Sequence, residues 1–269
     1  MNTQINVKQQ RRLQILPCLI SCAAQSTLLP RTQFQYRDNA SLVSHQFSPQ
    51  KLSISPRRQH RLPVLAVFAA AGPKKGPVVV VDNYDSFTFN LCQYLGSQGC
   101  EYIVLPNDAK TVEEIKSMNP RGILVSPGPG RPEDSGISLE IIEKLGPEGF
   151  PIFGVCMGHQ CIGQVFGGNV IRAPSGVMHG KASPVWHTNV GLVAGLANPF
   201  QAGRYHSLVI DKENCPEDLE VTAWCEDGTI MAVRHKKYPK VQGVQFHPES
   251  IITENGMLIV KNFVDTLED

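Results

Sequence analysis

The segment Gly154-Val155-Cys156-Met157-Gly158 constrains the fold most strongly, because it places a cysteine between two glycines at the end of an apolar run. The run Pro151–Phe153 is expected to end a buried strand, and residues 159–166 can form a helix. Flanking glycines let the chain turn sharply from a strand into a helix and leave room for substrate. The sulfur would then lie at a helix N-terminus, where the dipole favours the reactive thiolate. Taken alone, the pentapeptide is equally compatible with a cysteine buried under a tight turn.

A second motif, His247-Pro248-Glu249, follows the apolar run Val241–Phe246 near the end of the chain. A thiol nucleophile needs a base that takes its proton and a third group that orients the base. Residues two apart on an extended chain point to the same side, so His247 and Glu249 can supply both groups. By itself this motif would be interpreted as a surface turn. The two motifs together favour a Cys-His-Glu catalytic triad.

From residue 77 onward, apolar runs alternate with amphipathic ones, which favours a mainly parallel open sheet with helices on both faces, an α/β fold. The predicted strands are Val78–Val81, Tyr102–Leu105, Ile123–Val125, Ile152–Val155 and Val241–Phe246. The predicted helices are Phe87–Leu95, Val112–Met118, Ile137–Leu145 and an amphipathic helix near the C-terminus. Shorter β-rich segments between residues 170 and 233 predict a small antiparallel β region. We expect one domain over residues 76–269, which is long enough for a single core.

Charge separates the front of the chain from this domain. Residues 1–75 hold 11 lysines and arginines and one acidic residue, whereas residues 76–269 hold 14 basic and 23 acidic residues. A basic segment that is rich in Gln and Ser and almost free of acids is typical of organelle transit peptides. We therefore predict a cleavable transit peptide over residues 1–72. A basic arm for nucleic acid is an alternative that lacks interleaved aromatic residues, and a disordered tail is another.

Other classes of function are disfavoured by composition. The apolar segment Leu62–Ala71 has ten residues, about half of the ~20 that span a membrane. The eight cysteines include no C-x-x-C pair, so neither a disulfide scaffold nor a zinc site is expected. Several histidines are interpreted as hydrogen-bonded structural residues because the triad already contains its base; these are His159, His179, His187, His206 and His235.

The triad motifs resemble those of the class I, or triad, glutamine amidotransferases, whose hallmarks are G-x-C-x-G and a distant H-x-E. Further segments resemble the glutaminase subunits of anthranilate synthase and of aminodeoxychorismate synthase; they are residues 82–90, 126–130, 204–208 and 231–235. The resemblance covers residues 77–269 and implies a flavodoxin-like arrangement of the sheet. It also implies that Cys156, His247 and Glu249 are catalytic. The residues that it implies for glutamine or oxyanion binding are Gly128, Pro129, Gly130, Met157, Gln160, Ser207 and Leu208.

The resemblance also implies a partner subunit and a cellular location for the domain. No acceptor-using synthetase domain is recognised in the sequence, so a partner is expected to use the ammonia: a chorismate-binding alpha subunit in a heteromeric complex, two of each, that makes anthranilate for tryptophan. Mg²⁺ is expected on that partner and no cofactor or metal on this chain. The family further suggests a chloroplast location, with glutamine as substrate and neither nucleic acid nor membrane as partner.

Three alternatives remain at this point. The glutaminase of aminodeoxychorismate synthesis shares these motifs and differs in the product of its partner. A cysteine peptidase on a related α/β fold would cleave peptides and not glutamine. A binding protein on a degenerate scaffold would lack catalysis altogether, which the intact triad motifs disfavour.

Overall fold

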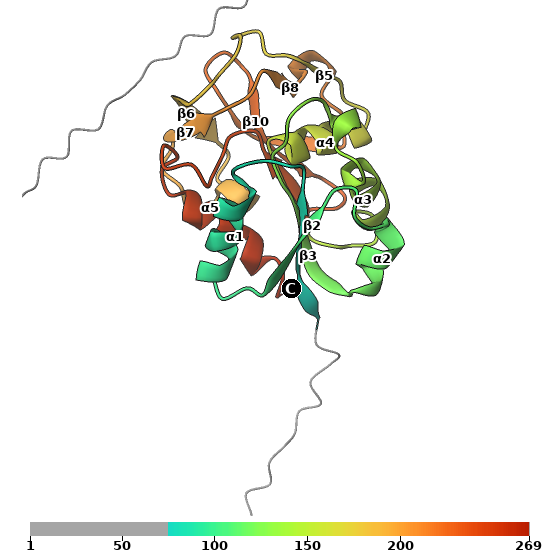
Figure 1. Ribbon diagram of the computed structural model, residues 1–269. Helices are drawn as coiled ribbons and strands as arrows, with labels where there is room; N and C mark the ends of the chain where they lie inside the picture. The colour runs from blue at the N-terminus through green and yellow to red at the C-terminus, as the bar shows by residue number, and fades with distance from the viewer. Residues whose placement is uncertain (1–74, 269) are drawn as a thin grey trace, which may run out of the picture. The chain divides into compact units, whose positions relative to one another are not determined.

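The computed structural model describes residues 75–268, so the predicted transit peptide over residues 1–72 lies outside the described residues. A nine-stranded sheet forms the centre, in the order β2-β1-β3-β4-β11-β10-β9-β6-β7 (Figure 1). Its strands are β1 (Gly76–Asp82), β2 (Tyr102–Pro106), β3 (Pro120–Val125), β4 (Ile152–Val155), β6 (Lys181–His187), β7 (Phe200–Arg204), β9 (Leu219–Trp224), β10 (Ile230–His235) and β11 (Val241–Val244). A second sheet pairs β5 (Val170–Arg172) with β8 (Leu208–Ile210). The helices are α1 (Thr88–Ser97), α2 (Val112–Ser117), α3 (Ser138–Leu145), α4 (Met157–Val165) and α5 (Gly256–Asp265).

The large sheet has a parallel half and an antiparallel half. Strands β2, β1, β3, β4 and β11 all pair in parallel. The pairs from β11 through β10, β9 and β6 to β7 are antiparallel. The predicted α/β fold with an added antiparallel region is therefore confirmed. Strands β10, β9, β6 and β7 extend the central sheet, whereas β5 and β8 form a small antiparallel pair apart from it.

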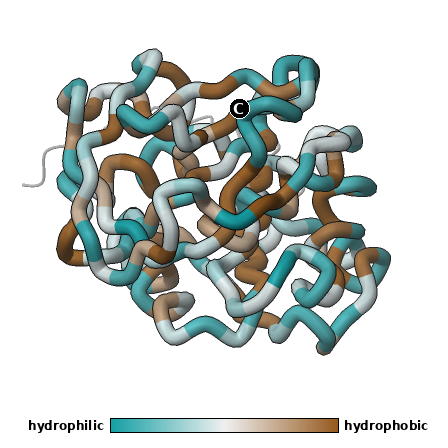
Figure 2. Tube along the Cα trace, turned by 90° about the horizontal axis from the view of Figure 1, so that it is seen from above, coloured by the Kyte–Doolittle hydropathy of each residue, from teal (hydrophilic) through white to brown (hydrophobic). Residues whose placement is uncertain are grey.

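Helices cover both faces of the parallel half, with α1 and α5 on one face and α2, α3 and α4 on the other (Figure 1). The alternation of side chains along β1 explains this layering. Val78 and Val80 belong to the core cluster that contains residues of α1 and α5, while Val79 and Val81 belong to the cluster with α2, α3 and α4. All four valines are fully buried, as expected for a strand covered on both faces. Figure 2 shows hydrophobic segments crossing the interior, with hydrophilic loops around the outline.

Several element boundaries differ from the predicted ones by one to three residues, and two of these differences lie beside the site. Strand β11 ends at Val244 rather than at Phe246. Beyond it the backbone N–H of Gln245 donates to the carbonyl of Met231 in β10, whereas β4 on the other side has already turned into a helix. Helix α1 begins at Thr88, just after an Asp85 carboxylate that accepts from the Phe87 N–H at 2.8 Å. The parallel ladder thus stops where the reactive segment begins.

Candidate active site

Cys156 lies at the junction of β4 and α4 in a strained backbone conformation, with φ of 50° and ψ of −96°. A non-glycine residue adopts positive φ only where the surroundings enforce it. Both flanking glycines are required by close backbone approach. A Cβ on Gly154 would lie 2.4 Å from the carbonyl carbon of Gly158, and a Cβ on Gly158 would lie 2.4 Å from the carbonyl oxygen of Val125. The two glycines therefore make the sharp strand-to-helix turn possible, and the turn sets Cys156 at the N-terminus of α4.

His247 reaches the same place because β11 is the parallel neighbour of β4. The last residues of the two strands, Val244 and Val155, are paired, and the Cys156 N–H donates to the Val244 carbonyl at 2.8 Å. Parallel strands bring their carboxyl ends to one edge of the sheet. The His247 backbone is held further by Gly203 of β7, whose carbonyl accepts from the His247 N–H at 3.0 Å. Although Cys156 and His247 are far apart in the sequence, the order of strands in the sheet thus brings them together.

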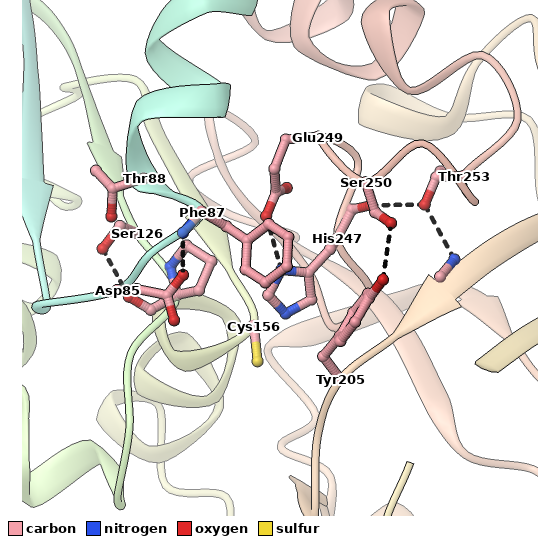
Figure 3. Close-up of polar contacts among 12 residues, drawn as sticks. Asp85, Phe87, Thr88, Ser126, Cys156, Tyr205, His247, Glu249, Ser250 and Thr253 are labelled. Carbon is pink, nitrogen blue, oxygen red and sulfur yellow. Dashed lines mark hydrogen bonds and ion pairs between the residues drawn. The ribbon is translucent and has the colours of Figure 1, made fainter. Parts of the chain in front are cut away.

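The predicted base and its orienting carboxylate are in direct contact. His247 Nδ1 lies 2.7 Å from Glu249 Oε1, and both side chains are almost fully buried. Nε2, the other ring nitrogen, has no hydrogen-bond partner within residues 75–268. Figure 3 shows it turned toward the sulfur of Cys156. The structure therefore brings Cys156, His247 and Glu249 together in the order expected for a nucleophile, a base and an orienting acid.

The surroundings of His247 stabilise its protonated form. Burial by itself disfavours the imidazolium, but the adjacent Cys156 and Glu249 side chains outweigh it and raise the pKa of His247 to about 10. Burial also penalises the charged form of a cysteine, which is the thiolate. It raises the pKa of Cys92 to about 11 and that of Cys161 to about 12. Those two thiols stay protonated at neutral pH. Cys156, by contrast, lies beside His247, and a protonated imidazole next to a cysteine is an arrangement that favours a thiolate.

A cavity of about 170 Å³ opens beside the nucleophile. Its lining consists of Gly128, Pro129, Gly130, Cys156, Gln160, Tyr205, His206, Ser207 and Leu208. Six of the seven residues that the resemblance implied for glutamine or oxyanion binding are among them. The seventh, Met157, is absent from the lining because its side chain is buried in the core. Its backbone N–H belongs to the first turn of α4, where amides have no intrahelical partner and can bind an oxyanion.

The loop that carries Gly128 and Gly130 is tied to the end of β1. The Asn83 backbone N–H donates to Ser126 Oγ at 2.9 Å, and the Asn83 side chain donates to the Ser126 carbonyl at 3.0 Å. Because β3 precedes this loop and lies beside β4, the loop meets the cavity from the side of the parallel strands. The cavity is thus bounded by strand ends of the parallel half and by residues that follow β7.

Three aromatic and polar neighbours of the triad were not predicted as site residues. Phe87 and Tyr205 pack against the His247 ring with centroid distances of 5.3 and 5.1 Å, and Figure 3 shows both rings beside it. Tyr205 also shares a hydrogen bond of 3.2 Å with Ser250. Gln245 donates through Nε2 to Cys156 Sγ at 3.5 Å. Tyr205 and Gln245 belong to or adjoin motifs that were recognised, yet nothing local in the sequence says which way their side chains point.

His206 combines the predicted structural role with a place in the cavity wall. Its Nε2 lies 3.1 Å from Arg204 Nε, an obligate donor, so Nε2 is the acceptor and Nδ1 carries the proton. That proton is directed at the Leu208 carbonyl, 3.2 Å away. Burial, together with the Arg204 charge, lowers the pKa of His206 to about 3. An imidazole with so low a pKa is a poor base, so His206 is not a substitute for His247.

Two further observations concern residues 75–268 alone. No helix in this range has the length and apolar character needed to cross a membrane. The same range contains no group of three or more His, Cys, Asp and Glu side chains that could hold a metal ion.

Comparisons with known proteins agree with this geometry. The family model described as glutamine amidotransferase class-I matches residues 79–267. The chain is 57% identical over 222 residues to a protein of Arabidopsis thaliana named anthranilate synthase beta subunit 1, chloroplastic, covering 81% of this chain and 79% of that protein. It is 50% identical over 204 residues to anthranilate synthase component 2 of Thermus thermophilus, covering 75% and 98%.

A solved structure supports the same assignment at the level of the fold. It is a putative GMP synthase subunit from Thermoplasma acidophilum, with a TM-score of 0.64 and 25% identity, covering 73% of this chain and 96% of that one. The family match agrees with the cysteine between two glycines and with the His-Glu pair beside it. The chain therefore belongs to the class-I glutamine amidotransferase family.

Proposed function

We propose that this protein is the glutaminase, or beta, subunit of anthranilate synthase: it hydrolyses glutamine and passes the ammonia to a chorismate-binding large subunit. The chemistry rests on the hydrogen bond between Glu249 and His247, whose Nε2 is turned toward the Cys156 sulfur (Figure 3), and on the small polar cavity beside Cys156. The assignment to anthranilate synthesis is supported by the names of the relatives. Besides those of Arabidopsis thaliana and Thermus thermophilus, a protein of Oryza sativa that is 62% identical over 196 residues is named anthranilate synthase beta subunit 2, chloroplastic.

In the first half-reaction, the Cys156 thiolate attacks the carbon of the glutamine side-chain amide and forms a tetrahedral intermediate. The Met157 N–H and the loop with Gly128 and Gly130 are the backbone donors available to its oxyanion. The His247 imidazolium gives its proton to the amide nitrogen as the carbon–nitrogen bond breaks. Ammonia leaves, and a γ-glutamyl thioester remains on Cys156.

In the second half-reaction, water replaces ammonia. His247, now neutral, takes a proton from the water as the water oxygen attacks the thioester carbon. The carbon–sulfur bond then breaks, which releases glutamate and restores the thiolate beside the imidazolium. Glu249 keeps the ring in one orientation through both steps, because its carboxylate stays hydrogen-bonded to Nδ1.

The ammonia acceptor belongs to the partner in this proposal. We infer a noncovalent heteromeric complex, with two copies of each subunit, in which the large subunit holds chorismate and Mg²⁺ while this chain uses no cofactor. We further infer a chloroplast location. The plant relatives are named chloroplastic, and the match to the second Arabidopsis thaliana beta subunit extends over 90% of this chain, so it includes part of the basic front segment.

The decisive experiment measures fluorescent anthranilate formed from chorismate, Mg²⁺ and glutamine when the protein without residues 1–72 is added to a purified anthranilate synthase large subunit. We expect glutamine-dependent product that disappears with Cys156→Ala, while product formation from ammonium salts persists in the same complex. Glutaminase activity that survives Cys156→Ala would contradict the mechanism.

The same assay separates the pathway from the chemistry. Glutamine hydrolysis without anthranilate would retain the amidotransferase chemistry and assign the acceptor to another synthase, such as the one that makes aminodeoxychorismate. Cleavage of peptides without glutamine hydrolysis would contradict the glutaminase assignment as a whole.

A further inference from the structure

Gln245 contacts the reacting sulfur although it belongs to neither triad motif. It lies just beyond the end of β11, its side chain is fully buried, and its Nε2 donates to Cys156 Sγ at 3.5 Å. An amide can present either its NH₂ group or its oxygen to a neighbour, and only the NH₂ group favours a negatively charged sulfur. The effect of Gln245 on the nucleophile therefore depends on which end of its amide faces Cys156.

The neighbours of Gln245 decide that orientation. The carbonyl of Leu208 is an acceptor only, so the Gln160 amide must turn its NH₂ group toward it, at 3.1 Å. The same NH₂ group lies 3.3 Å from the Gln245 amide, where it needs an acceptor. The oxygen of Gln245 must then face Gln160, which leaves its own NH₂ group for the sulfur.

The Leu208 carbonyl is itself held in place. It accepts from the Nδ1–H of His206 at 3.2 Å, and His206 has this tautomer because Arg204 donates to its Nε2 at 3.1 Å. Arg204 is 2% exposed and cannot lose its proton. A run of hydrogen bonds thus joins the buried guanidinium of Arg204 to Cys156. It meets at the Leu208 carbonyl, which accepts from both His206 and Gln160, so neither of these two donors can be reversed.

We propose that Gln245 stabilises the Cys156 thiolate by donating an N–H hydrogen bond, and that Gln160, through the Leu208 carbonyl, fixes the amide in the donating orientation. The inference deepens the proposed glutaminase function and rests on Cys156 being its nucleophile. The thiolate needs this stabilisation twice in each cycle, before it attacks the amide and when the thioester breaks. Gln245 acts on the reacting atom, whereas Gln160 acts on sulfur only through Gln245 and is a positioning residue for it.

Alkylation of the free protein tests the proposal without glutamine or the large subunit. The rate at which iodoacetamide modifies Cys156 is measured between pH 5 and 10, with the site of modification identified by peptide mass spectrometry. Gln245→Met keeps the volume and removes the donor. We expect Cys156 to react at least about tenfold more slowly at pH 7, with the pH of half-maximal rate raised, because a hydrogen bond to a charged group is lost.

Two variants distinguish donation from packing. Gln242→Met is the matched control, since Gln242 is a similarly buried glutamine on β11 that accepts from the Leu192 N–H; its alkylation profile should equal that of the wild type. Gln160→Met leaves Gln245 in place without its orienting partner, so a smaller slowing, by roughly two- to fivefold, is expected. Thermal unfolding of each variant verifies that it is folded.

The outcomes are separable. A Gln245→Met protein that is folded and whose Cys156 alkylation profile matches the wild type overturns the proposal, as does an equal change in Gln242→Met. If Gln160→Met leaves the profile unchanged while Gln245→Met shifts it, the orienting role of Gln160 is overturned and the donation by Gln245 stands. If Cys156 of the wild type reacts no faster at pH 7 than the buried Cys161, the nucleophile assignment itself fails, and the proposed function fails with it.

Discussion

The parallel and antiparallel halves of the sheet contribute different groups to the cavity. The parallel half brings Cys156 from the end of β4 and the His247–Glu249 pair from beyond the end of β11. The antiparallel half brings Tyr205, His206 and Ser207, which follow β7, and the next residue, Leu208, begins β8; all four line the cavity. The groups that we propose exchange protons and bonds thus come from the parallel half, whereas the groups that line the cavity come from that half and from residues 205–208.

The physical basis of this division is the geometry of strand ends. In the parallel half, neighbouring strands end at the same edge between two layers of helices, so side chains just beyond them are held rigidly and close together. In the antiparallel half, β7 ends near this edge at Arg204, and the residues just after it form a wall of the cavity. Reactive groups that need sub-ångström placement are better served by the first arrangement, whereas a wall tolerates variation in its side chains. Substitutions in the two halves should therefore differ in which kinetic or stability property they change and in the size of the change.

The largest effect is expected from the parallel half. His247→Asn removes the general acid and base, and glutamine-dependent anthranilate formation should fall by about 10²–10⁴-fold. Ser207→Ala in the cavity wall should cost about tenfold or less, mainly through KM. Steady-state kinetics of the complex measure both, with ammonia-dependent activity as the control that should stay constant. Similar losses of kcat in the two variants would remove the distinction between the halves.

A stability effect is expected at the turn that presents the nucleophile. Gly158→Ala places a methyl group 2.4 Å from the Val125 carbonyl oxygen, and it should lower the free energy of unfolding by about 1–3 kcal/mol. Gly96→Ala is the matched control, because Gly96 lies in α1 and the nearest atom to its Cβ would be 3.6 Å away. The control should stabilise the protein by up to about 1 kcal/mol. Urea unfolding followed by circular dichroism gives both values, and equal signs would contradict the close-approach argument.

The two halves should also respond oppositely to pH. In the wall, the folded-state pKa of His206 is lowered to about 3, so the stability from its neutral form is present above its unfolded value and is lost as pH falls below about 6.5. The loss is at most about 1.4 kcal/mol per pH unit. In the triad, the pKa of His247 is raised to about 10, so its contribution is complete below about 6.5 and is lost as pH rises toward 10.

His206→Gln tests the acid side of this prediction. Glutamine can still accept from Arg204 but does not titrate, so the decline in unfolding free energy between pH 7 and 5 should be shallower than in the wild type. His206→Gln and wild-type curves measured by urea unfolding at several pH values would give the difference. Parallel curves would show that His206 is not neutral in the folded protein.

The smallest effect is expected from the hydroxyl of Tyr205. Tyr205→Phe removes the 3.2 Å hydrogen bond to Ser250 and keeps the ring that packs against His247. A single neutral hydrogen bond contributes about 0.5–1.5 kcal/mol, so kcat/KM for glutamine should fall by about tenfold or less. Tyr205→Ala removes the ring as well and should cost more. Equal kinetic losses in the two variants would assign the role of Tyr205 to its hydroxyl rather than to its packing.

Much of the fold was predictable because the parallel strands are continuous apolar runs, and such runs mark strands buried on both faces. The antiparallel extension was predicted only as a β-rich region, since the pairing of its short strands depends on partners far along the chain. The placement of the predicted triad residues could be anticipated because the turn at Cys156 needs its flanking glycines and because His247 and Glu249 are two residues apart. Met157 was expected for oxyanion binding; its side chain lies in the core, and only its backbone remains available.

By itself, the sequence determined the turn at Cys156, the His-Glu pair and the alternation of strands and helices, because each depends on the conformation of neighbouring residues. The tertiary structure alone decided that β11 lies beside β4, that Tyr205 and Phe87 pack on His247, and that Gln245 donates to the sulfur of Cys156. These contacts depend on sheet order and on the directions of buried side chains. Local sequence patterns reveal neither the sheet order nor these directions, since both are set by the packing of segments that are distant in the chain.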